Sequence, residues 1–452
     1  MNIIQIVSDT FRRDFLGCYG NEWIHTEHID AFAKESLVFD RAYIASFPTI
    51  PHRRDLFTGR YTFTYSKWSP LPTDEIILSQ LLRQAGYTTM LIGDTYHLFR
   101  DAHYFDRGFD GWWWIRGQEH DRYMTCPTKD ATERQKAVGV QYLQNVSNRR
   151  YESDYFVAQT MTEAAKWLES NHDQHEKFFL HVDTFDPHEP WDPPKWYAEM
   201  YDPGWKGGEV SGGAYIPGEP TWRRSAPLTE DELNHLRALY AGEVTMVDRW
   251  VGMLFQKIED LGLLENTAVI FTTDHGTYHG EHGYLRKNPH LYEETAHIPL
   301  IIRLPDSESK KRGRCNTLVQ PTDLMPTILE WAGVECPKTV QGKSLLPIIN
   351  GEDFEERKIT ISSASLIDPE TLRITVTSKD WSLITVRSDA PSMDSLGVKL
   401  EPELYHFPTD PKQTRNIFHE EKEIAEELHC NTIRLLESLG TREDLLRIWR
   451  KK

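Results

Sequence analysis

Two carboxylates and one imidazole occur in this sequence where a metal site could form. Asp9 follows the apolar run Ile3 to Val7, and the pair Asp274-His275 follows the run Ala268 to Thr273. If both runs are strands of one parallel sheet, these side chains emerge at its carboxyl edge, where open α/β sheets bind ligands. Together with a hydroxyl, such a set suits one Mn²⁺ or Zn²⁺ ion and tolerates Ca²⁺. The alternative is that Asp9 caps a helix and that Asp274-His275 is a polar turn.

A hydroxyl that could act as the nucleophile of such a site is found in the segment Thr49-Ile50-Pro51-His52-Arg53. Pro51 is typical of the first turn of a helix, so Thr49 is expected at a helix N-terminus, where backbone N–H groups favour an anionic oxygen. A free threonine is a poor nucleophile, but a metal-bound hydroxyl ionises far more easily. Arg53, one turn later, could stabilise the alkoxide or the transferring group. The simpler alternative is that Thr49 is an ordinary N-cap.

The elements that must position these residues alternate along most of the chain, which indicates a mostly parallel central sheet flanked by helices. Further strands are predicted at Thr88 to Ile92, Phe178 to Thr184 and Leu300 to Arg303. Helices are predicted at Ile76 to Gln84, Phe156 to Glu169, Glu230 to Leu261 and Asp323 to Trp331.

The C-terminal part of the sequence has a different pattern. Short strand-like runs at hairpin spacing begin near Lys358, and an amphipathic helix is predicted from about Glu420 to Leu439, before Gly440. We therefore expect a boundary near Gly351, with a catalytic domain over residues 1–350 and a small antiparallel α+β subdomain over residues 351–452.

Length and composition fit a large enzyme and exclude several other classes. The 452 residues can form a large domain and a smaller one. No apolar run approaches the ~20 residues that span a bilayer, and the N-terminus lacks the features of a secretory signal, so we expect a cytoplasmic protein with no membrane partner. A net charge of -18 argues against nucleic-acid binding, but a bound metal can still attract a small anionic substrate. The five scattered cysteines are expected to be reduced thiols.

The segment from Thr49 to Arg60 resembles the sulfatase signature, which reads Cys or Ser, any residue, Pro, usually Ser, Arg, and then a short apolar helix ending in Thr-Gly-Arg. Other strings that resemble sulfatase landmarks follow in family order over nearly the whole chain. They include Val7-Ser8-Asp9-Thr10, Thr273-Asp274-His275-Gly276, Gly280-Glu281-His282-Gly283, Ile298-Pro299-Leu300-Ile301 and Gly342-Lys343-Ser344-Leu345-Leu346-Pro347. The protein is thus similar to sulfatases of the alkaline phosphatase superfamily, whose fold it is expected to share.

The resemblance implies a role for each candidate residue. The metal ligands would be Asp9, Thr49, Asp274 and His275, and the catalytic residues Thr49, Arg53, His188 and Lys287. Lys287 matches a family lysine that contacts sulfuryl or phosphoryl oxygens. His188 matches a family histidine near the leaving group and could protonate a departing alkoxide, unless it is an incidental histidine in a rigid loop flanked by prolines. His282 either orients a ligand from outside the metal site or is a packing residue.

The chain departs from the sulfatase pattern at three places that bear on its chemistry. Thr49 cannot be oxidised to formylglycine, because its Cβ carries a methyl group, so we expect no formylglycine. Thr10 replaces a second aspartate, which weakens the case for Ca²⁺. Where sulfatases have Gly-Lys-Trp-His this chain has Gly93-Asp94-Thr95-Tyr96-His97, so a carboxylate replaces a cation. Asp94 is either a loop residue, a group that binds the substrate, or a cause of preference for singly charged esters.

These departures make the site pattern more similar to phosphonate monoester hydrolases and to phosphotransferases that use threonine. We therefore predict a metal-dependent hydrolase of phosphate esters, with phosphodiesters or phosphonate monoesters favoured and a covalent intermediate at Thr49. The main alternative is a sulfuric ester hydrolase with an atypical threonine. A phosphotransferase and an inactive metal-binding scaffold are further alternatives. Family members are often dimers or larger, which leaves a homo-oligomer open.

Overall fold

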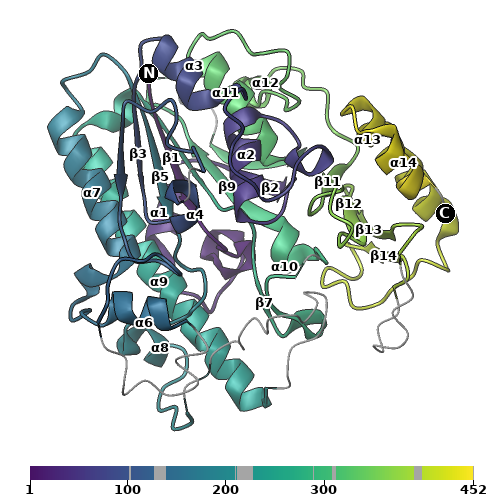
Figure 1. Ribbon diagram of the computed structural model, residues 1–452, viewed down its shortest axis with the longest axis horizontal. Coiled ribbons are helices and arrows are strands. Elements are labelled where there is room, and N and C mark those ends of the chain that lie inside the picture. Colours follow the sequence, from purple (N-terminus) through teal and green to yellow (C-terminus); the bar gives the residue numbers. More distant parts are fainter. Residues whose placement is uncertain are drawn as a thin grey trace.

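The structure is a computed structural model that describes residues 1–100, 103–126, 139–208, 210, 228–288, 290–307, 312–390 and 400–450. A large sheet with helices on both faces forms most of the molecule, and a smaller sheet with two helices lies beside it (Figure 1). Within the described ranges, no helix combines the length and the apolar character needed to cross a membrane.

The large sheet is mostly parallel, as predicted. Its strand order is β10-β2-β9-β6-β1-β5-β3-β4, and β9 alone among these strands runs antiparallel to its neighbours, β6 and β2. The strands are β1 (Asn2–Ser8), β2 (Leu37–Tyr43), β3 (Thr88–Gly93), β4 (Gly111–Trp114), β5 (Phe178–Thr184), β6 (Thr267–Thr272), β9 (His297–Arg303) and β10 (Gly313–Val319). The sequence pattern predicted β1, β3, β5, β6 and β9 but not β2, β4 or β10.

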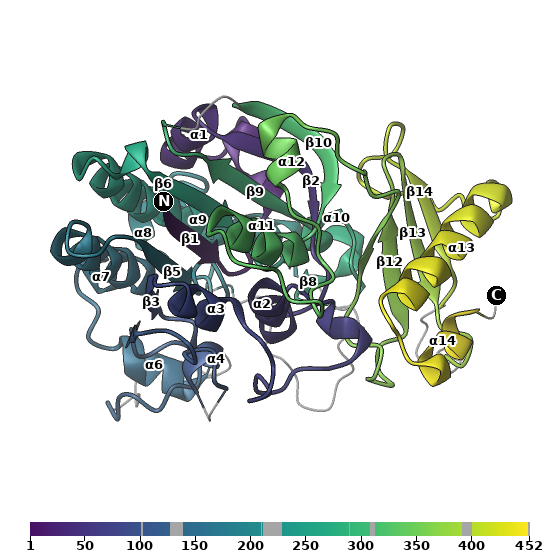
Figure 2. The same cartoon turned by 90° about the horizontal axis from the view of Figure 1, so that it is seen from above.

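Helices cover the two faces of this sheet (Figure 2). One face packs on α1 (Glu27–Lys34), α7 (Phe156–Asn171) and α9 (Glu230–Asp260), and the other on α2 (Thr49–Thr58), α3 (Leu78–Gln84), α11 (Leu324–Trp331) and α12 (Leu346–Asn350). Residues of β1 alternate between the two cores, with Ile3 and Val7 in one and Ile4 and Ile6 in the other. A strand buried on both faces explains why β1 has a continuous apolar run.

Short elements connect these layers at the edge of the sheet where the strands end. They are α4 (Tyr96–Phe99), α6 (Val140–Val146), α8 (Lys195–Glu199), α10 (Glu293–Ala296) and the hairpin of β7 (Tyr278–His279) with β8 (Leu285–Arg286). The long helix α9 begins with a capping box, because the Thr229 hydroxyl accepts from the backbone N–H of Glu232 and the Glu232 carboxylate accepts from the backbone N–H of Thr229.

The C-terminal sheet is antiparallel, with the order β11-β12-β13-β14. Its strands are β11 (Thr360–Ser362), β12 (Arg373–Thr377), β13 (Trp381–Val386) and β14 (Glu403–His406), and α13 (Lys422–Ser438) and α14 (Glu443–Arg450) pack on it. Leu436, Leu383 and Trp449 belong to its separate hydrophobic core. The four-stranded sheet confirms the predicted antiparallel unit, and the predicted domain boundary at Gly351 stays a prediction.

The two sheets are joined at the segment that precedes α2. Ser46 pairs with Ser363 in an isolated parallel bridge, the Phe47 N–H donates to the Ser363 carbonyl at 2.9 Å, and the Ser363 N–H donates to the Ala45 carbonyl at 2.9 Å. The smaller sheet thus holds the chain just before Thr49.

Candidate active site

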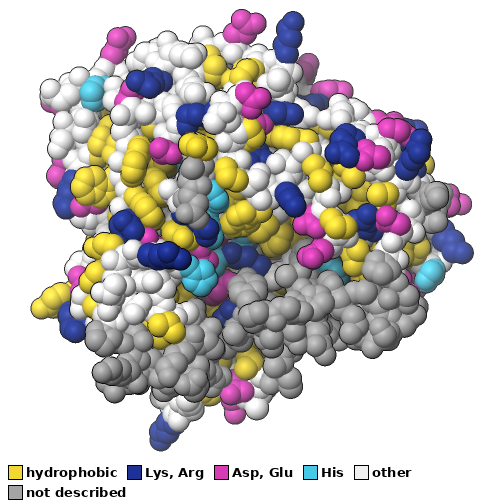
Figure 3. All heavy atoms as spheres, in the orientation of Figure 1, with side chains coloured by type: hydrophobic (Ala, Val, Ile, Leu, Met, Phe, Trp, Pro, Cys, Tyr) yellow, Lys and Arg dark blue, Asp and Glu magenta, His cyan; other side chains and the backbone are white. Residues whose placement is uncertain are grey.

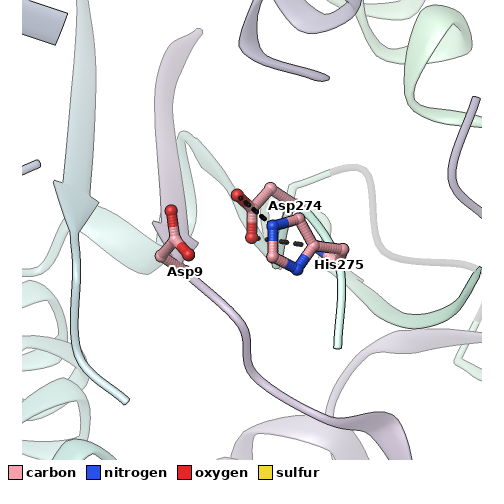
Figure 4. A group of neighbouring side chains, drawn as sticks. All are labelled: Asp9, Asp274 and His275. Carbon is pink, nitrogen blue, oxygen red and sulfur yellow. Dashed lines mark hydrogen bonds and ion pairs between the residues drawn. The ribbon is translucent and has the colours of Figure 1, made fainter. Parts of the chain in front are cut away.

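Asp9, Asp274 and His275 come together at the carboxyl edge of the large sheet. Val7 of β1 lies opposite Thr272 of β6, and Asp9 and Asp274 each follow two residues later, so the two parallel strands deliver them side by side. One ligand atom of each of the three residues lies within 4.8 Å of the others, and all three side chains are buried (Figure 4).

The atoms of this group fit a divalent cation. The His275 Nδ1–H donates to the Gly276 carbonyl at 2.8 Å, and its buried Nε2 has no hydrogen-bond partner among the described residues. Burial lowers the pKa of His275 to about 4, so the ring is neutral at pH 7 and Nε2 carries a lone pair. The buried oxygens of Asp9 also accept no hydrogen bond of suitable geometry from the described residues, although Oδ2 forms an ion pair with Arg53. Burial and then the Asp274 carboxylate raise the pKa of Asp9, an unfavourable arrangement that a bound cation would relieve.

Thr49 is the first residue of α2, and its hydroxyl is not used for capping. The N-cap position belongs to Pro48, and no side chain caps the helix. The buried Thr49 Oγ1 has no hydrogen-bond partner among the described residues. The ring of Phe47, two residues earlier, lies 4.9 Å from the ring of His275, centre to centre, which brings the start of α2 against the metal-ligand group.

Arg53 lies one turn after Thr49, on the same face of α2. Its Nη1 forms an ion pair with Asp9 Oδ2 at 2.9 Å and also contacts Asp274. Although burial opposes it, the charge of Arg53 holds the pKa of Asp274 well below its ordinary value. The face of α2 that carries Thr49 therefore turns toward the carboxylates.

Asp183, a residue that the sequence analysis missed, binds the other edge of the Arg53 guanidinium. Arg53 Nε donates to Asp183 Oδ2 at 3.1 Å, and Arg53 Nη2 donates to Asp183 Oδ1 at 2.8 Å. Asp183 lies in β5, within an otherwise largely apolar run. The signal that could have found it is a carboxylate in a strand expected to be buried on both faces, since such a group requires a cationic partner.

Lys287 and His188 contact each other beside this group. Lys287 Nζ approaches His188 Nε2, and the His188 Nδ1–H donates to the Glu189 carbonyl. Burial and then the Lys287 ammonium lower the pKa of His188 well below its ordinary value, so His188 is neutral and its Nε2 accepts from Lys287. Besides burial, the charge of Lys287 also lowers the pKa of His275, which places the ammonium near the metal-ligand group.

A second pair, formed by His97 and by Glu119, which the sequence analysis missed, flanks Lys287 and His188. His97 Nε2 lies 2.5 Å from Glu119 Oε2. Against the effect of burial, the charge of His97 lowers the pKa of Glu119 to about 2. His188 and Lys287 contribute to the same shift, so the four side chains are neighbours. Figure 3 shows that histidine, basic and acidic side chains gather in a hollow near the middle of one face of the molecule.

The two predicted substrate-binding residues have other contacts in the structure. Asp94 is buried at the end of β3, where Oδ1 accepts from the Phe185 N–H at 2.6 Å and Oδ2 accepts from the Thr184 hydroxyl at 3.2 Å. The His282 ring stacks on Tyr292 with centres 3.8 Å apart, and its Nε2 lies 3.4 Å from Glu294. A contact of Asp94 or His282 with substrate stays a prediction.

Comparison with known proteins shows the family. A family model described as Sulfatase matches residues 1–334, and a model described as the C-terminal region of N-sulphoglucosamine sulphohydrolase matches residues 280–438. An uncharacterized sulfatase of Escherichia coli (strain K12), YidJ, is 29% identical over 367 residues, which cover 77% of this chain and 71% of that protein.

Solved structures share the fold. The phosphonate monoester hydrolase of Agrobacterium radiobacter superposes with a TM-score of 0.74 at 20% identity, covering 97% of this chain and 95% of that one. A protein solved in complex with its substrate D-glucosamine-2-N,6-O-disulfate superposes with a TM-score of 0.73 at 22% identity, covering 100% and 99%. These identities support the fold alone. The family model, which matches most of the chain, shows that this protein belongs to the sulfatase family of hydrolases.

Proposed function

We propose that this protein hydrolyses phosphodiesters or phosphonate monoesters through a covalent phosphothreonine at Thr49. The observation that supports it is the Thr49 hydroxyl, which is buried, has no partner among the described residues, and shares a helix face with Arg53 at the Asp9–Asp274 group. This hydroxyl replaces the residue that other sulfatases convert to formylglycine.

Asp9, Thr49, Asp274 and His275 would hold one divalent ion, with Mn²⁺ or Zn²⁺ favoured over Ca²⁺. Such an ion supplies a Lewis acid that lowers the pKa of the Thr49 hydroxyl and polarises a bound phosphoryl oxygen. The neutral His275 and the low pKa of Asp274 keep both residues in the forms that ligate metals at neutral pH.

The residues of the chain divide the reaction into two displacements. Thr49 Oγ1 loses its proton to solvent and attacks phosphorus, and the bond from phosphorus to the leaving oxygen breaks. A proton held between Lys287 Nζ and His188 Nε2 passes to that oxygen. The positive charge of Arg53, which is held beside the metal-ligand carboxylates, would stabilise the negative charge that increases on the equatorial oxygens. Water then attacks phosphorus and gives one proton to Thr49 Oγ1 as the bond from phosphorus to that oxygen breaks, and solvent returns a proton to the pair of Lys287 and His188.

Thr49 supports phosphoryl over sulfuryl chemistry for a structural reason. An ester of formylglycine hydrate can expel its anion by re-forming the aldehyde, but an ester of threonine has no second oxygen on Cβ that could do so. Its release requires a second attack at the phosphorus or sulfur centre. The replacement of a lysine by Asp94 removes a positive charge, which favours a singly charged ester over a dianion.

A paired substrate panel tests this proposal. After chelation and restoration of each metal, we expect kcat/KM for bis-p-nitrophenyl phosphate and a phenyl phosphonate ester to exceed that for p-nitrophenyl phosphate and p-nitrophenyl sulfate by about tenfold or more. Intact mass of the protein quenched during turnover should show a phosphoryl adduct that maps to Thr49. Preferred turnover of the phosphate monoester, or an adduct elsewhere, would reject the proposed substrate or nucleophile respectively.

A sulfuric ester hydrolase is the second candidate, because the relative from Escherichia coli is named a sulfatase and one structural neighbour was solved with a disulfated sugar. This reading predicts that p-nitrophenyl sulfate is the best substrate in the panel. It also predicts that Thr49→Ser keeps this activity with no aldehyde in its mass spectrum.

A further inference from the structure

We propose that Asp183 is a positioning residue that fixes Arg53 beside Thr49 and completes the charge balance of the metal site. The inference deepens the proposed function and rests on it for its turnover measurements, while its cation-binding measurements need no substrate. The side chain is fully buried in β5, between β1 and β3, where it lies opposite Val7 on one side and Gly93 on the other.

The Asp183 carboxylate is surrounded by donors that hold it in one orientation. Besides Arg53 Nε and Nη2, the Thr95 hydroxyl donates to Oδ1 at 2.5 Å, and His181 Nε2 lies 3.4 Å from Oδ2. Two parallel bonds to one carboxylate fix the plane of a guanidinium as well as its position. Arg53 therefore has a single arrangement, in which Nη1 points away from Asp183.

The remaining edge of Arg53 contacts the metal-ligand group. Nη1 lies 2.9 Å from Asp9 Oδ2 and also contacts Asp274, while Asp183 is not a member of the close group formed by Asp9, Asp274 and His275. Asp183 thus acts on the site through Arg53, which lies between it and the two ligand carboxylates.

The charges of these four residues match a divalent ion. When Asp9 is deprotonated, as a metal ligand must be, the carboxylates of Asp9, Asp183 and Asp274 and the guanidinium of Arg53 carry a net charge of about -2 in a buried volume, where unbalanced charge is costly. One divalent cation neutralises this set. Without Asp183 the set would carry about -1, and a divalent cation would leave an excess positive charge.

This arrangement accounts for one departure of the chain from the sulfatase pattern. The family carries a second aspartate directly after the first, and here that position is Thr10. The structure supplies a third buried carboxylate from β5 instead. Thr95, which belongs to the segment that replaces Gly-Lys-Trp-His, is one of the donors that orient it. Asp183 is thus a buried carboxylate beside the site in a chain that has a threonine in place of the second aspartate, and it contacts one residue of the replaced segment.

Calorimetric titration with Mn²⁺ alone tests the charge balance. After removal of metals with a chelator, we expect Asp183→Asn, which keeps the shape of the side chain, to bind Mn²⁺ about 10- to 100-fold more weakly than the wild type. Asp248→Asn is the matched control, because Asp248 is a buried carboxylate in α9 whose oxygens accept from the backbone of His28 and Ile29. It should lower the melting temperature and leave the Mn²⁺ affinity within about twofold, since it touches none of the site residues.

Steady-state kinetics with bis-p-nitrophenyl phosphate at saturating Mn²⁺ test the positioning of Arg53. Asp183→Asn should lower kcat by about 100-fold with a much smaller change in KM, because a displaced Arg53 stabilises the transition state less than before. In an Arg53→Lys background, which cannot form the paired bonds, the same substitution should lower kcat by less than about fivefold. A purely structural role would give the same loss in both backgrounds.

A folded Asp183→Asn protein with wild-type Mn²⁺ affinity and kcat would overturn the proposal. If that variant does not fold, Thr95→Val serves instead, because it removes one donor to Asp183. We expect the Mn²⁺ affinity and kcat of Thr95→Val each to fall about threefold. Unchanged values of both would overturn the proposal. If the wild type binds Mn²⁺ but cleaves no phosphate ester, the proposed function is rejected. The comparison of Mn²⁺ affinities then decides the inference about Asp183 alone.

Discussion

At the scale of single residues, the proposed chemistry depends on the Thr49 hydroxyl. We expect Thr49→Ala to lower kcat by about 10³-fold or more, because it removes the proposed nucleophile at the first residue of α2. Thr58→Ala is its control: Thr58 is buried at the other end of the same helix, where its hydroxyl donates to the Arg54 carbonyl at 2.7 Å. Steady-state kinetics and thermal melting of both variants check this, and a Thr49→Ala protein as active as Thr58→Ala would contradict it.

Candidate site residues could be predicted from the sequence where a residue of suitable chemical type lies directly after a predicted strand or within a motif. Asp9, Asp274 and His275 follow strands, and the structure brings them together with Arg53. Asp183 and Glu119 carried no such signal. The first is a carboxylate within a strand run, and the second lies in an irregular segment and meets His97 only through the tertiary fold.

At the scale of elements, helix α2 is held by one buried carboxylate. Asp55 accepts from the Ser46 N–H at 2.8 Å, the Ser46 hydroxyl at 2.9 Å and the Thr62 N–H at 2.8 Å, so it ties the segments before and after the helix to it. Burial raises the pKa of Asp55 to about 7, although these hydrogen bonds lower it. The position of Thr49 depends on this clamp.

The raised pKa of Asp55 gives a pH dependence with a definite sign. Between about pH 4 and pH 7 the folded state holds a proton on Asp55 that the unfolded state has lost, so this group stabilises the fold less as pH rises. Asp55→Asn should be less stable than the wild type, because an amide offers fewer acceptors. The difference in the free energy of unfolding between Asp55→Asn and the wild type should shrink as pH rises, by up to about 1.4 kcal/mol per pH unit over this window. Urea unfolding at several pH values measures this, and a constant deficit would show that Asp55 does not titrate there.

The elements themselves were predictable where an apolar run was continuous. The runs of β1 and β5 and the capped helix α9 agree with the predicted ranges to within about two residues. Strands β2 and β10 were missed because polar residues interrupt them: Asp40-Arg41 in the first, and Arg314 and Asn316 in the second. The antiparallel direction of β9 could not be predicted, since direction depends on the connection and not on the apolar pattern.

At the scale of the whole molecule, the C-terminal sheet supports the segment that carries Lys287. Thr375 donates to the Leu291 carbonyl at 2.7 Å, and the Tyr292 hydroxyl donates to Glu403 Oε2 at 2.7 Å. Glu403 is in turn held by Arg373, whose Nη1 donates to Oε1 at 2.6 Å. The smaller sheet therefore holds the chain a few residues after Lys287, although none of its described residues is a candidate site residue.

The hydroxyls of Tyr292 and Tyr405 donate to the same oxygen, Glu403 Oε2, which allows a matched test of this support. The Tyr405 hydroxyl also donates to Glu403 Oε2 at 2.7 Å, but Tyr405 lies within the C-terminal sheet. Both Tyr292→Phe and Tyr405→Phe should lower the free energy of unfolding by about 1 kcal/mol. Only Tyr292→Phe should lower kcat/KM, by about fivefold, because it releases the segment that carries Lys287. Equal kinetic effects in the two variants would show that the anchor is merely structural.

The bridge between Ser46 and Ser363 has a consequence for biosynthesis. The chain just before the nucleophile pairs with a segment that leaves the ribosome long after it, once the strands of the large sheet have been made. Because contacts so distant in the sequence form late and slowly, a nascent chain can assemble its main sheet while its reactive threonine is still unsupported. Under the proposed function, the support that the small sheet gives to Thr49 would thus be one of the last contacts to form in the new chain.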